Sequence, residues 1–89
     1  MDTMFALGQL VSTPSIPETF TPEETAKCLA RHQSGDWGDT CSADKRLNDL
    51  AVKDGDRLIS SYKFEDGRKL WVITEHDRSV TTLTKPEEY

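Results

Sequence analysis

Residues 57–83 read RLISSYKFEDGRKLWVITEHDRSVTTL and hold most of the large apolar side chains of this protein. Two runs rich in β-branched and aromatic residues flank Asp66-Gly67. This pair favours a two-residue type I′ turn because it tolerates positive φ at both central positions. A second break follows at His76-Asp77. The stretch therefore predicts strands at 57–64 and 69–75 joined as a hairpin, and a third strand at 79–84.

A two-residue turn would also set the register of the hairpin, placing Phe64 opposite Lys69 and Tyr62 opposite Trp71. Side chains alternate between the faces of a strand, so one face is expected to carry the bulky residues Leu58, Tyr62, Phe64, Trp71 and Ile73. The more polar second face would carry Ile59, Ser61, Lys63, Leu70, Val72 and Thr74. We therefore expect the Tyr62 and Trp71 face to form the core.

Two helices are expected before the hairpin. Thr21-Pro22-Glu23-Glu24 supplies an N-cap, a proline at the first helical position and a capping-box glutamate, so a helix is predicted at 22–33 with Gly35 closing it. A second helix is predicted at 43–53, with Ser42 as its cap. Its inner face is expected to consist of Leu47, Leu50 and Ala51.

The N-terminal part adds one more strand to this prediction. Residues 5–11, FALGQLV, are apolar, and Gly8 within them indicates a bulge or a close backbone approach. Pro14 and Pro17 bracket a connection that is expected to be neither helix nor inner strand. The fold class is thus α+β in one domain, 1–89, with a three- or four-stranded antiparallel sheet and two helices on one face.

Charge and composition narrow the classes of function. The chain is 30% charged with a net charge of −5, which argues against a basic stripe that binds nucleic acid. The positive residues Lys45, Arg46 and Lys53 stand among aspartates, so direct nucleic-acid binding is not expected. Carboxylates can stand in for phosphates in a DNA mimic, but 16 acidic against 11 basic residues is also typical of a solvated surface.

The location and redox state follow from the apolar segments and the cysteines. No run of about 20 apolar residues is present, and the first residues lack the basic and apolar regions of a signal peptide. We therefore expect a cytoplasmic protein without a membrane anchor. Cys28 and Cys41 are then expected to be thiols rather than a disulfide.

Two segments hold the residues that could carry chemistry. The first contains His32, Cys41 and the acids between them, and the second contains His76. A small metal- or thiol-dependent enzyme could use the His32–Cys41 loop with His76, but no pair has the usual spacing of zinc ligands. Cys28 and His32 are four residues apart on one helix, where a buried structural cysteine is also expected. The sequence predicts no cofactor, metal or catalytic residue.

Partner binding is the other reading of these two segments. Trp37 between two glycines can either cover the sheet or form an interface hot spot, and Arg78 can bind a partner's carboxylate or make a salt bridge within its own turn. The aspartates can instead cap turns or a helix start. The candidate partner-binding residues are Asp36, Trp37, Asp39, His76, Asp77 and Arg78.

Four segments resemble a group of small uncharacterised proteins carried on bacterial plasmids, phages and integrated elements. They are LGQLVSTP (7–14), HQSGDWGD (32–39), LNDLAVKDGDRLISSY (47–62) and WVITEHDRSVTTLTKPEEY (71–89). The resemblance implies a setting, because small acidic proteins of mobile elements often bind and block host machinery such as restriction and CRISPR effectors. We therefore expect a non-enzymatic module that binds a host or mobile-element protein, possible roles being antirestriction and anti-CRISPR inhibition.

Overall fold

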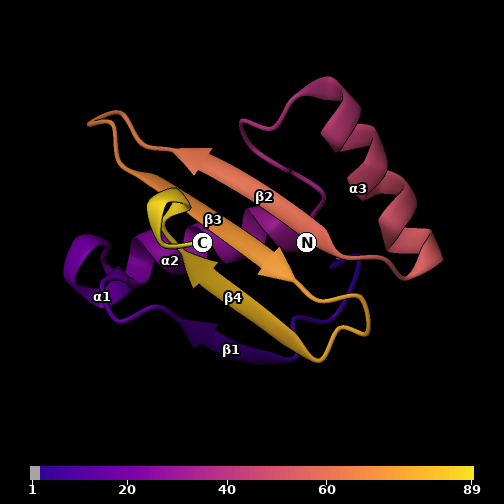
Figure 1. The fold of residues 1–89 in the computed structure, drawn as a ribbon, viewed down its shortest axis with the longest axis horizontal. Coiled ribbons are helices and arrows are strands. Elements are labelled where there is room, and N and C mark those ends of the chain that lie inside the picture. The colour runs from indigo at the N-terminus through magenta and orange to yellow at the C-terminus, as the bar shows by residue number, and fades with distance from the viewer. Residues whose placement is uncertain (1–2) are drawn as a thin grey trace.

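The computed structural model describes residues 3–89. Figure 1 shows the elements, with α2 behind the sheet and α3 beside its β2 edge. In chain order they are β1 (Gln9–Ser12), α1 (Ile16–Thr19), α2 (Pro22–Gln33), α3 (Ser42–Asp54), β2 (Leu58–Lys63), β3 (Lys69–Thr74), β4 (Val80–Thr84) and the 3-10 turn η1 (Pro86–Glu88).

The sheet confirms the expected α+β class, and it is mixed rather than antiparallel throughout. Its strand order is β1-β4-β3-β2, in which β2, β3 and β4 form the expected antiparallel meander. β1 instead pairs with β4 in parallel, from Gln9 beside Val80 to Ser12 beside Leu83. Parallel neighbours need a long connection, and the helices and the other two strands lie between β1 and β4 in the chain.

The hairpin forms at Asp66-Gly67, but its loop has three residues, which shifts the expected register by one. The Phe64 N–H donates to the Arg68 carbonyl (2.8 Å) and the Gly67 N–H donates to the Phe64 carbonyl (2.9 Å). Gly67 has φ +94° and no other residue of this loop has positive φ, as a type I turn followed by a bulge requires. Tyr62 consequently pairs with Leu70, and Trp71 pairs with Ser61.

This shift turns the predicted β3 face over, because one residue of slip moves every side chain of a strand to the opposite side. Tyr62 is buried in the core as expected, whereas Trp71 and Ile73 lie on the other face of the sheet. Phe64 is only partly buried and packs against the core from the hairpin end. The inner face consists of Leu58, Ser60, Tyr62, Leu70, Val72, Thr74, Thr81 and Leu83.

Helix α2 has the predicted bounds because its ends are defined by local chemistry. Thr21 and Glu24 form both halves of the capping box. At the other end, Gly35 adopts φ +86° and the Asp36 N–H donates to the Arg31 carbonyl, as in a Schellman motif. Glu24 also binds Arg68 of the hairpin loop through Oε2 and Nη2 (2.6 Å), so this pair joins α2 to the β2–β3 loop.

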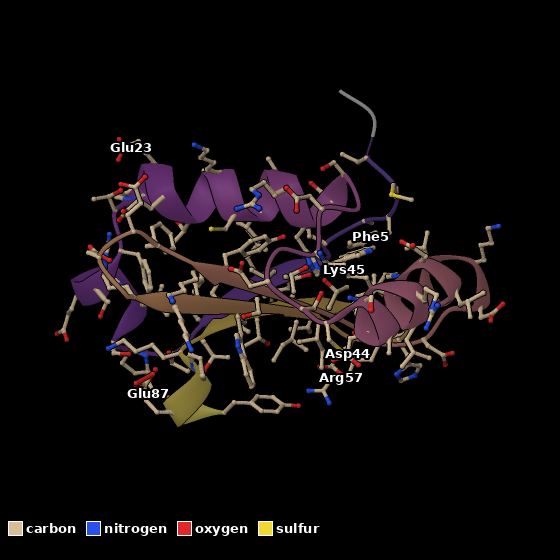
Figure 2. The ribbon with its side chains drawn as sticks, turned by 90° about the horizontal axis from the view of Figure 1, so that it is seen from above. Phe5, Glu23, Asp44, Lys45, Arg57 and Glu87 are labelled. Atoms are coloured by element: carbon tan, nitrogen blue, oxygen red, sulfur yellow. The ribbon has the colours of Figure 1, made fainter. Side chains whose placement is uncertain are left out.

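Helix α3 buries Ala51 as predicted but not Leu47 and Leu50. Cys41 rather than Ser42 is the N-cap, and Ser42 is the first helical residue. Asn48 and Ala51 are buried, whereas Leu47 and Leu50 are 63% and 56% exposed. The reason is the position of α3, which lies along the β2 edge instead of over the face that α2 covers (Figures 1 and 2).

Two short segments in the N-terminal part of the chain differ from expectation. Ile16–Thr19 is one helical turn, with Pro17 in its first turn, where a proline needs no N–H partner. The N-terminal strand is Gln9–Ser12 and begins after Gly8, whose φ is +67°. A Cβ on Gly8 would meet the Arg78 carbonyl oxygen at 2.5 Å, so Gly8 marks the expected close backbone approach.

Candidate functional site

Trp37 lies inside the protein and not on its surface. It is 3% exposed and packs with Ala51 and Leu58 in a cluster that joins α3 to the sheet. Its indole N–H donates to Asp49 Oδ1 (2.9 Å), and its ring stacks on Phe5 at 6.2 Å. A buried tryptophan whose N–H is already bonded offers no surface to a partner. Trp37 therefore belongs to the core, and its burial argues against the predicted role in partner binding.

The residues after Trp37 close the β2 edge of the sheet. The Ser61 N–H donates to the Trp37 carbonyl (3.2 Å), and the Ser61 carbonyl accepts the Asp39 N–H (2.6 Å). Asp39 Oδ2 accepts the Lys63 N–H (2.7 Å), while the Asn48 side chain bonds both backbone groups of Ile59. Asp39, an expected partner-binding residue, therefore stabilises the β2 edge. Because the backbone groups of this edge are already bonded, it cannot pair with another strand.

Asp36 is likewise engaged within the protein. Its carboxylate pairs with Arg31 (Nε to Oδ2, 2.7 Å) and accepts the Gly38 N–H. The hydrogen bond from Arg31 holds the pKa of this carboxyl below its usual range. Its backbone carbonyl accepts the Tyr62 hydroxyl at 2.6 Å. Asp36 thus stabilises the turn, although its side chain remains about half exposed.

Arg78 holds the turn between β3 and β4 against the end of α3. Its Nη1 donates to the Asp56 carbonyl (2.6 Å) and to the Glu75 carbonyl (3.1 Å), and its Nη2 donates to the Ala51 carbonyl (2.8 Å). No ion pair to Arg78 is found among residues 3–89, so the expected salt bridge is replaced by backbone contacts. Asp77 shapes the same turn by accepting the Ser79 N–H (3.0 Å).

We predict that Arg78→Ala lowers the free energy of unfolding by about 2–3 kcal/mol, because carbonyls at the end of α3 lose a charged donor. Urea unfolding followed by tryptophan fluorescence measures the change. His76→Ala is the matched control: His76 is exposed in the same turn and should change stability by less than about 0.5 kcal/mol. Equal stability of the two variants would refute a structural role for Arg78.

His32 lies at the centre of a buried hydroxyl chain on the inner face of the sheet. It is 0% exposed, with Nδ1 2.5 Å from Ser60 Oγ and Nε2 2.9 Å from Thr74 Oγ1. Thr74 Oγ1 lies 2.8 Å from Thr81 Oγ1, which in turn donates to the Leu7 carbonyl (2.7 Å). These contacts connect α2 with β2, β3, β4 and the segment before β1.

The Leu7 carbonyl at one end of this chain determines the direction of its hydrogen bonds as far as Nε2 of His32. Thr81 must donate to Leu7, so Thr81 accepts from Thr74, and Thr74 then accepts from the ring. Nε2 of His32 therefore carries a proton, and in the neutral ring Nδ1 accepts from Ser60. Burial, aided by the positive charge of Arg78, lowers the pKa of His32 to about 4, in agreement with a neutral ring.

This geometry does not favour the enzyme alternative. Ser60 and His32 are both 0% exposed, so a substrate cannot reach them. Cys28 is buried and its burial raises the pKa of the thiol, while Cys41 is exposed at the start of α3. Within residues 3–89, no three His, Cys, Asp or Glu side chains gather closely enough to hold a metal ion.

The face of the sheet opposite α2 carries partly exposed apolar and aromatic side chains, and α3 beside it carries exposed leucines. We call this the outer surface, made of Leu47, Leu50, Arg57, Ile59, Trp71 and Tyr89. Leu47, Ile59 and Arg57 line one hollow of about 230 Å³ together with Thr40, Asp44 and Asn48. In Figure 2, Asp44 and Arg57 lie on this side of the molecule and Glu23 of α2 lies on the other.

Aromatic contacts extend the outer surface from this hollow across β3. Arg57 lies over the ring of Tyr89 (5.3 Å) and donates to its hydroxyl, while the Tyr89 ring packs edge-on against Trp71 at 5.5 Å. Arg57 Nε is also 3.7 Å from Glu75 Oε2. Tyr89 remains 60% exposed, so the C-terminal residues cover Trp71 without closing the outer surface.

The outer surface differs from the predicted site because the sequence predicts buried positions for its apolar residues on α3 and β3. Leu47 and Leu50 are one helical turn apart, which indicates an apolar stripe but not its direction. A two-residue hairpin loop predicts Trp71 in the core, whereas the observed register, shifted by one residue, turns it outward. A three-residue loop at Glu65-Asp66-Gly67 was the signal that could have placed Trp71 outside.

No helix among residues 3–89 combines the length and the apolar character needed to cross a membrane. Comparisons with protein-family models, with curated proteins and with solved structures give no match to this chain. The arguments about its function therefore rest on its own residues and their geometry.

Proposed function

We propose that this chain is a non-enzymatic protein-binding module of a mobile genetic element, which inhibits a host defence system of the restriction or CRISPR type. The partner binds the outer surface. The observation that carries the proposal is the exposure of Leu47 and Tyr89, which are joined by Arg57: it lines the hollow together with Leu47 and lies over the Tyr89 ring. Leu50, also exposed, is one helical turn from Leu47. Contiguous apolar surface with polar borders is characteristic of protein interaction sites.

The composition of the outer surface supports a protein partner. Interfaces are enriched in tryptophan, tyrosine and arginine, and the outer surface brings Trp71, Tyr89 and Arg57 into contact with one another. The hollow beside them can receive one apolar side chain of the partner. Thr40, which lines this hollow, has the one buried side-chain oxygen without a hydrogen-bond partner among residues 3–89.

Charge favours a basic partner in the cytoplasm. The chain has a net charge of −5, and Asp44 borders the hollow of the outer surface. Complementary charge accelerates association and selects partners. Restriction and CRISPR effectors hold nucleic acid in positively charged channels, and the resemblance to proteins of plasmids and phages supports this class of target.

We predict that Leu47→Lys combined with Leu50→Lys weakens binding to the partner at least about tenfold, because a charge replaces each apolar contact at the interface. Both side chains are more than half exposed, so the free energy of unfolding should change by less than about 0.5 kcal/mol. Binding is measured with the effector complexes of restriction and CRISPR systems, and inhibition by phage plaquing on strains that carry them.

The matched control is Ala26→Lys combined with Ala30→Lys, two residues one turn apart on α2 that are not buried. This pair adds the same charge on the opposite side of the sheet and should leave binding and plaquing unchanged. The proposal fails if the wild type neither binds nor inhibits any effector of these systems. It also fails if both lysine pairs reduce binding equally.

A further inference from the structure

The two edges of the sheet differ in whether their outward backbone groups have hydrogen-bond partners. At the β2 edge, backbone groups of Ile59, Ser61 and Lys63 are bonded by Asn48 and by residues 37–39. At the β1 edge, all four residues of Gln9–Ser12 are exposed, and Figure 1 shows no element beyond β1. An open edge is a template for another strand.

The hydrogen bonds of β1 show which backbone groups are free. The Gln9 N–H donates to the Ser79 carbonyl (2.9 Å), and the Thr13 N–H donates to the Leu83 carbonyl (3.0 Å). Alternation along the strand then directs Gln9, Val11 and Thr13 toward β4, and directs the N–H and C=O of Leu10 and Ser12 outward. Within residues 3–89 no hydrogen bond reaches these outward groups.

This edge also lacks charge. Between Thr3 and Pro17 the sequence contains no Asp, Glu, Lys or Arg, in a chain that is 30% charged. Natural edge strands commonly carry lysine, proline or inward-pointing charges that prevent pairing, and Gln9–Ser12 has none of these. One carboxylate lies beside the end of this strand, that of Glu88, which accepts hydrogen bonds from the Thr13 and Ser15 hydroxyls (2.7 Å each). Along Gln9–Ser12 itself, two copies with a net charge of −5 each meet no charged side chain of this segment.

A second copy fits this edge in one antiparallel register. Leu10 of each copy lies opposite Ser12 of the other, so their free backbone groups bond, and Val11 faces Val11 across the two-fold axis. Leu10 and Ser12 share the face of Thr81 and Leu83. Ser12 also lines a hollow of about 240 Å³ whose walls include Ile16, Phe20 and Leu83, so Leu10 of the second copy lies beside this apolar hollow.

We propose that two copies of this chain associate through β1, forming one continuous sheet with Val11 at the two-fold axis. The paired strands are short and bury less than about 1,200 Å², so we expect a dissociation constant on the order of 10–100 μM. The association is independent of the outer surface, since β1 and β2 lie at opposite edges of the sheet.

Disulfide cross-linking tests the register, in a Cys41→Ser background because Cys41 is exposed. Facing residues of a non-hydrogen-bonded pair have Cα atoms about 4.5 Å apart, within reach of a disulfide. Val11→Cys should therefore form a covalent dimer under mild oxidation. Gln9→Cys is the control, because its two introduced thiols would stand on residues about 14 Å apart at ~3.4 Å per residue.

Sedimentation equilibrium of the whole chain tests the association itself. Leu10→Pro removes an outward N–H and places a ring in the path of the second strand, but it breaks no bond to β4. It should raise the dissociation constant at least about tenfold, whereas Leu10→Val should preserve the dimer. Circular dichroism confirms that each variant is folded.

Three results would overturn the proposal. One is a wild-type chain that remains monomeric at concentrations of about 1 mM, which are well above the expected dissociation constant. Another is cross-linking of the Gln9→Cys variant that is as efficient as that of the Val11→Cys variant. The third is a folded Leu10→Pro variant that dimerises like the wild type. None of them bears on partner binding, which the lysine pairs at Leu47 and Leu50 test separately.

Discussion

Replacing Gly38 by alanine is expected to lower the free energy of unfolding by about 3–5 kcal/mol, the largest effect we predict for a single methyl group. Gly38 has φ +73°, which L side chains rarely adopt. A Cβ at this position would collide with the Ser61 carbonyl oxygen and would lie 2.6 Å from Tyr62 Cδ1. Neither neighbour can move freely, because Ser61 belongs to β2 and Tyr62 is buried.

The substitution would also affect the neighbours of Gly38, because this residue lies directly against β2. Gly38 forms the bridge with Ser61, and its neighbours Trp37 and Asp39 make the two backbone hydrogen bonds to that residue. Displacing Gly38 would open the β2 edge and disturb Trp37 in the core. Small domains are commonly stable by about 5–10 kcal/mol, so Gly38→Ala should remove a large part of the total.

Gly67→Ala is the matched control for this prediction. Gly67 also has positive φ, at +94°, but a Cβ there meets no atom within 4 Å. Only the conformational cost applies, and we expect a loss of about 1 kcal/mol. Urea unfolding measured by tryptophan fluorescence gives both values. If the two substitutions cost the same, the close approach of Gly38 to β2 is not a determinant of stability.

Acid is expected to destabilise the fold by about 3 kcal/mol between pH 6.5 and pH 4 through His32 alone. The ordinary pKa of histidine is near 6.5, and burial lowers the pKa of His32 to about 4. In this range the unfolded chain binds a proton that the folded chain does not. The contribution of His32 is therefore complete above about pH 6.5 and is lost as the pH falls toward 4.

The hydroxyl chain explains why His32 resists protonation. A proton on Nδ1 would turn the acceptor of the Ser60 hydrogen bond into a donor, and the new charge would be buried near Arg78.

Carboxyl groups that are stabilised as anions lose their stabilising effect at lower pH than His32 does. Hydrogen bonds from Arg68 and Thr21 lower the pKa of Glu24 to about 2, so its stabilising effect is lost only as the pH falls below about 4.5.

Urea unfolding at a series of pH values between 7 and about 4.5 isolates the contribution of His32 from that of the carboxyl groups. His32→Gln should lower stability at pH 7, because Gln cannot reproduce both contacts of the ring, and should flatten the profile in this range. His76→Gln, an exposed control, should preserve the wild-type slope. A wild-type profile that is flat from pH 7 to 5 would contradict the assignment.

Local chemistry predicted α2 and the meander well. The bounds of α2 follow from the capping box at Thr21 and Glu24 and from the left-handed Gly35, which act within a few residues of each end. The position of the hairpin follows in the same way from Asp66-Gly67. These features depend on neighbours in the chain, so the sequence contains the information that decides them.

The candidate site was harder to predict, because exposure depends on contacts between distant residues. Trp37 has the appearance of an interface residue until its N–H is seen to bond Asp49 of α3. Arg78 resembles a ligand for a carboxylate, yet its donors are used by carbonyls such as that of Ala51. In both cases a helix elsewhere in the chain supplies the partner, and spacing along the sequence does not reveal it.

The α+β class, the order of the main elements and the acidic charge of −5 can all be read from the sequence. The buried faces of β3 and α3 were settled by contacts within the folded chain. The three-residue loop before Arg68 sets the register that turns Trp71 outward, and the pair of Arg68 with Glu24 joins this loop to α2. Asn48 bonds the edge of β2 and so turns Leu47 and Leu50 to the surface. A repeat of apolar residues every two positions in a strand, or every three to four in a helix, indicates that one face is apolar. Whether that face points into the core depends on long-range contacts.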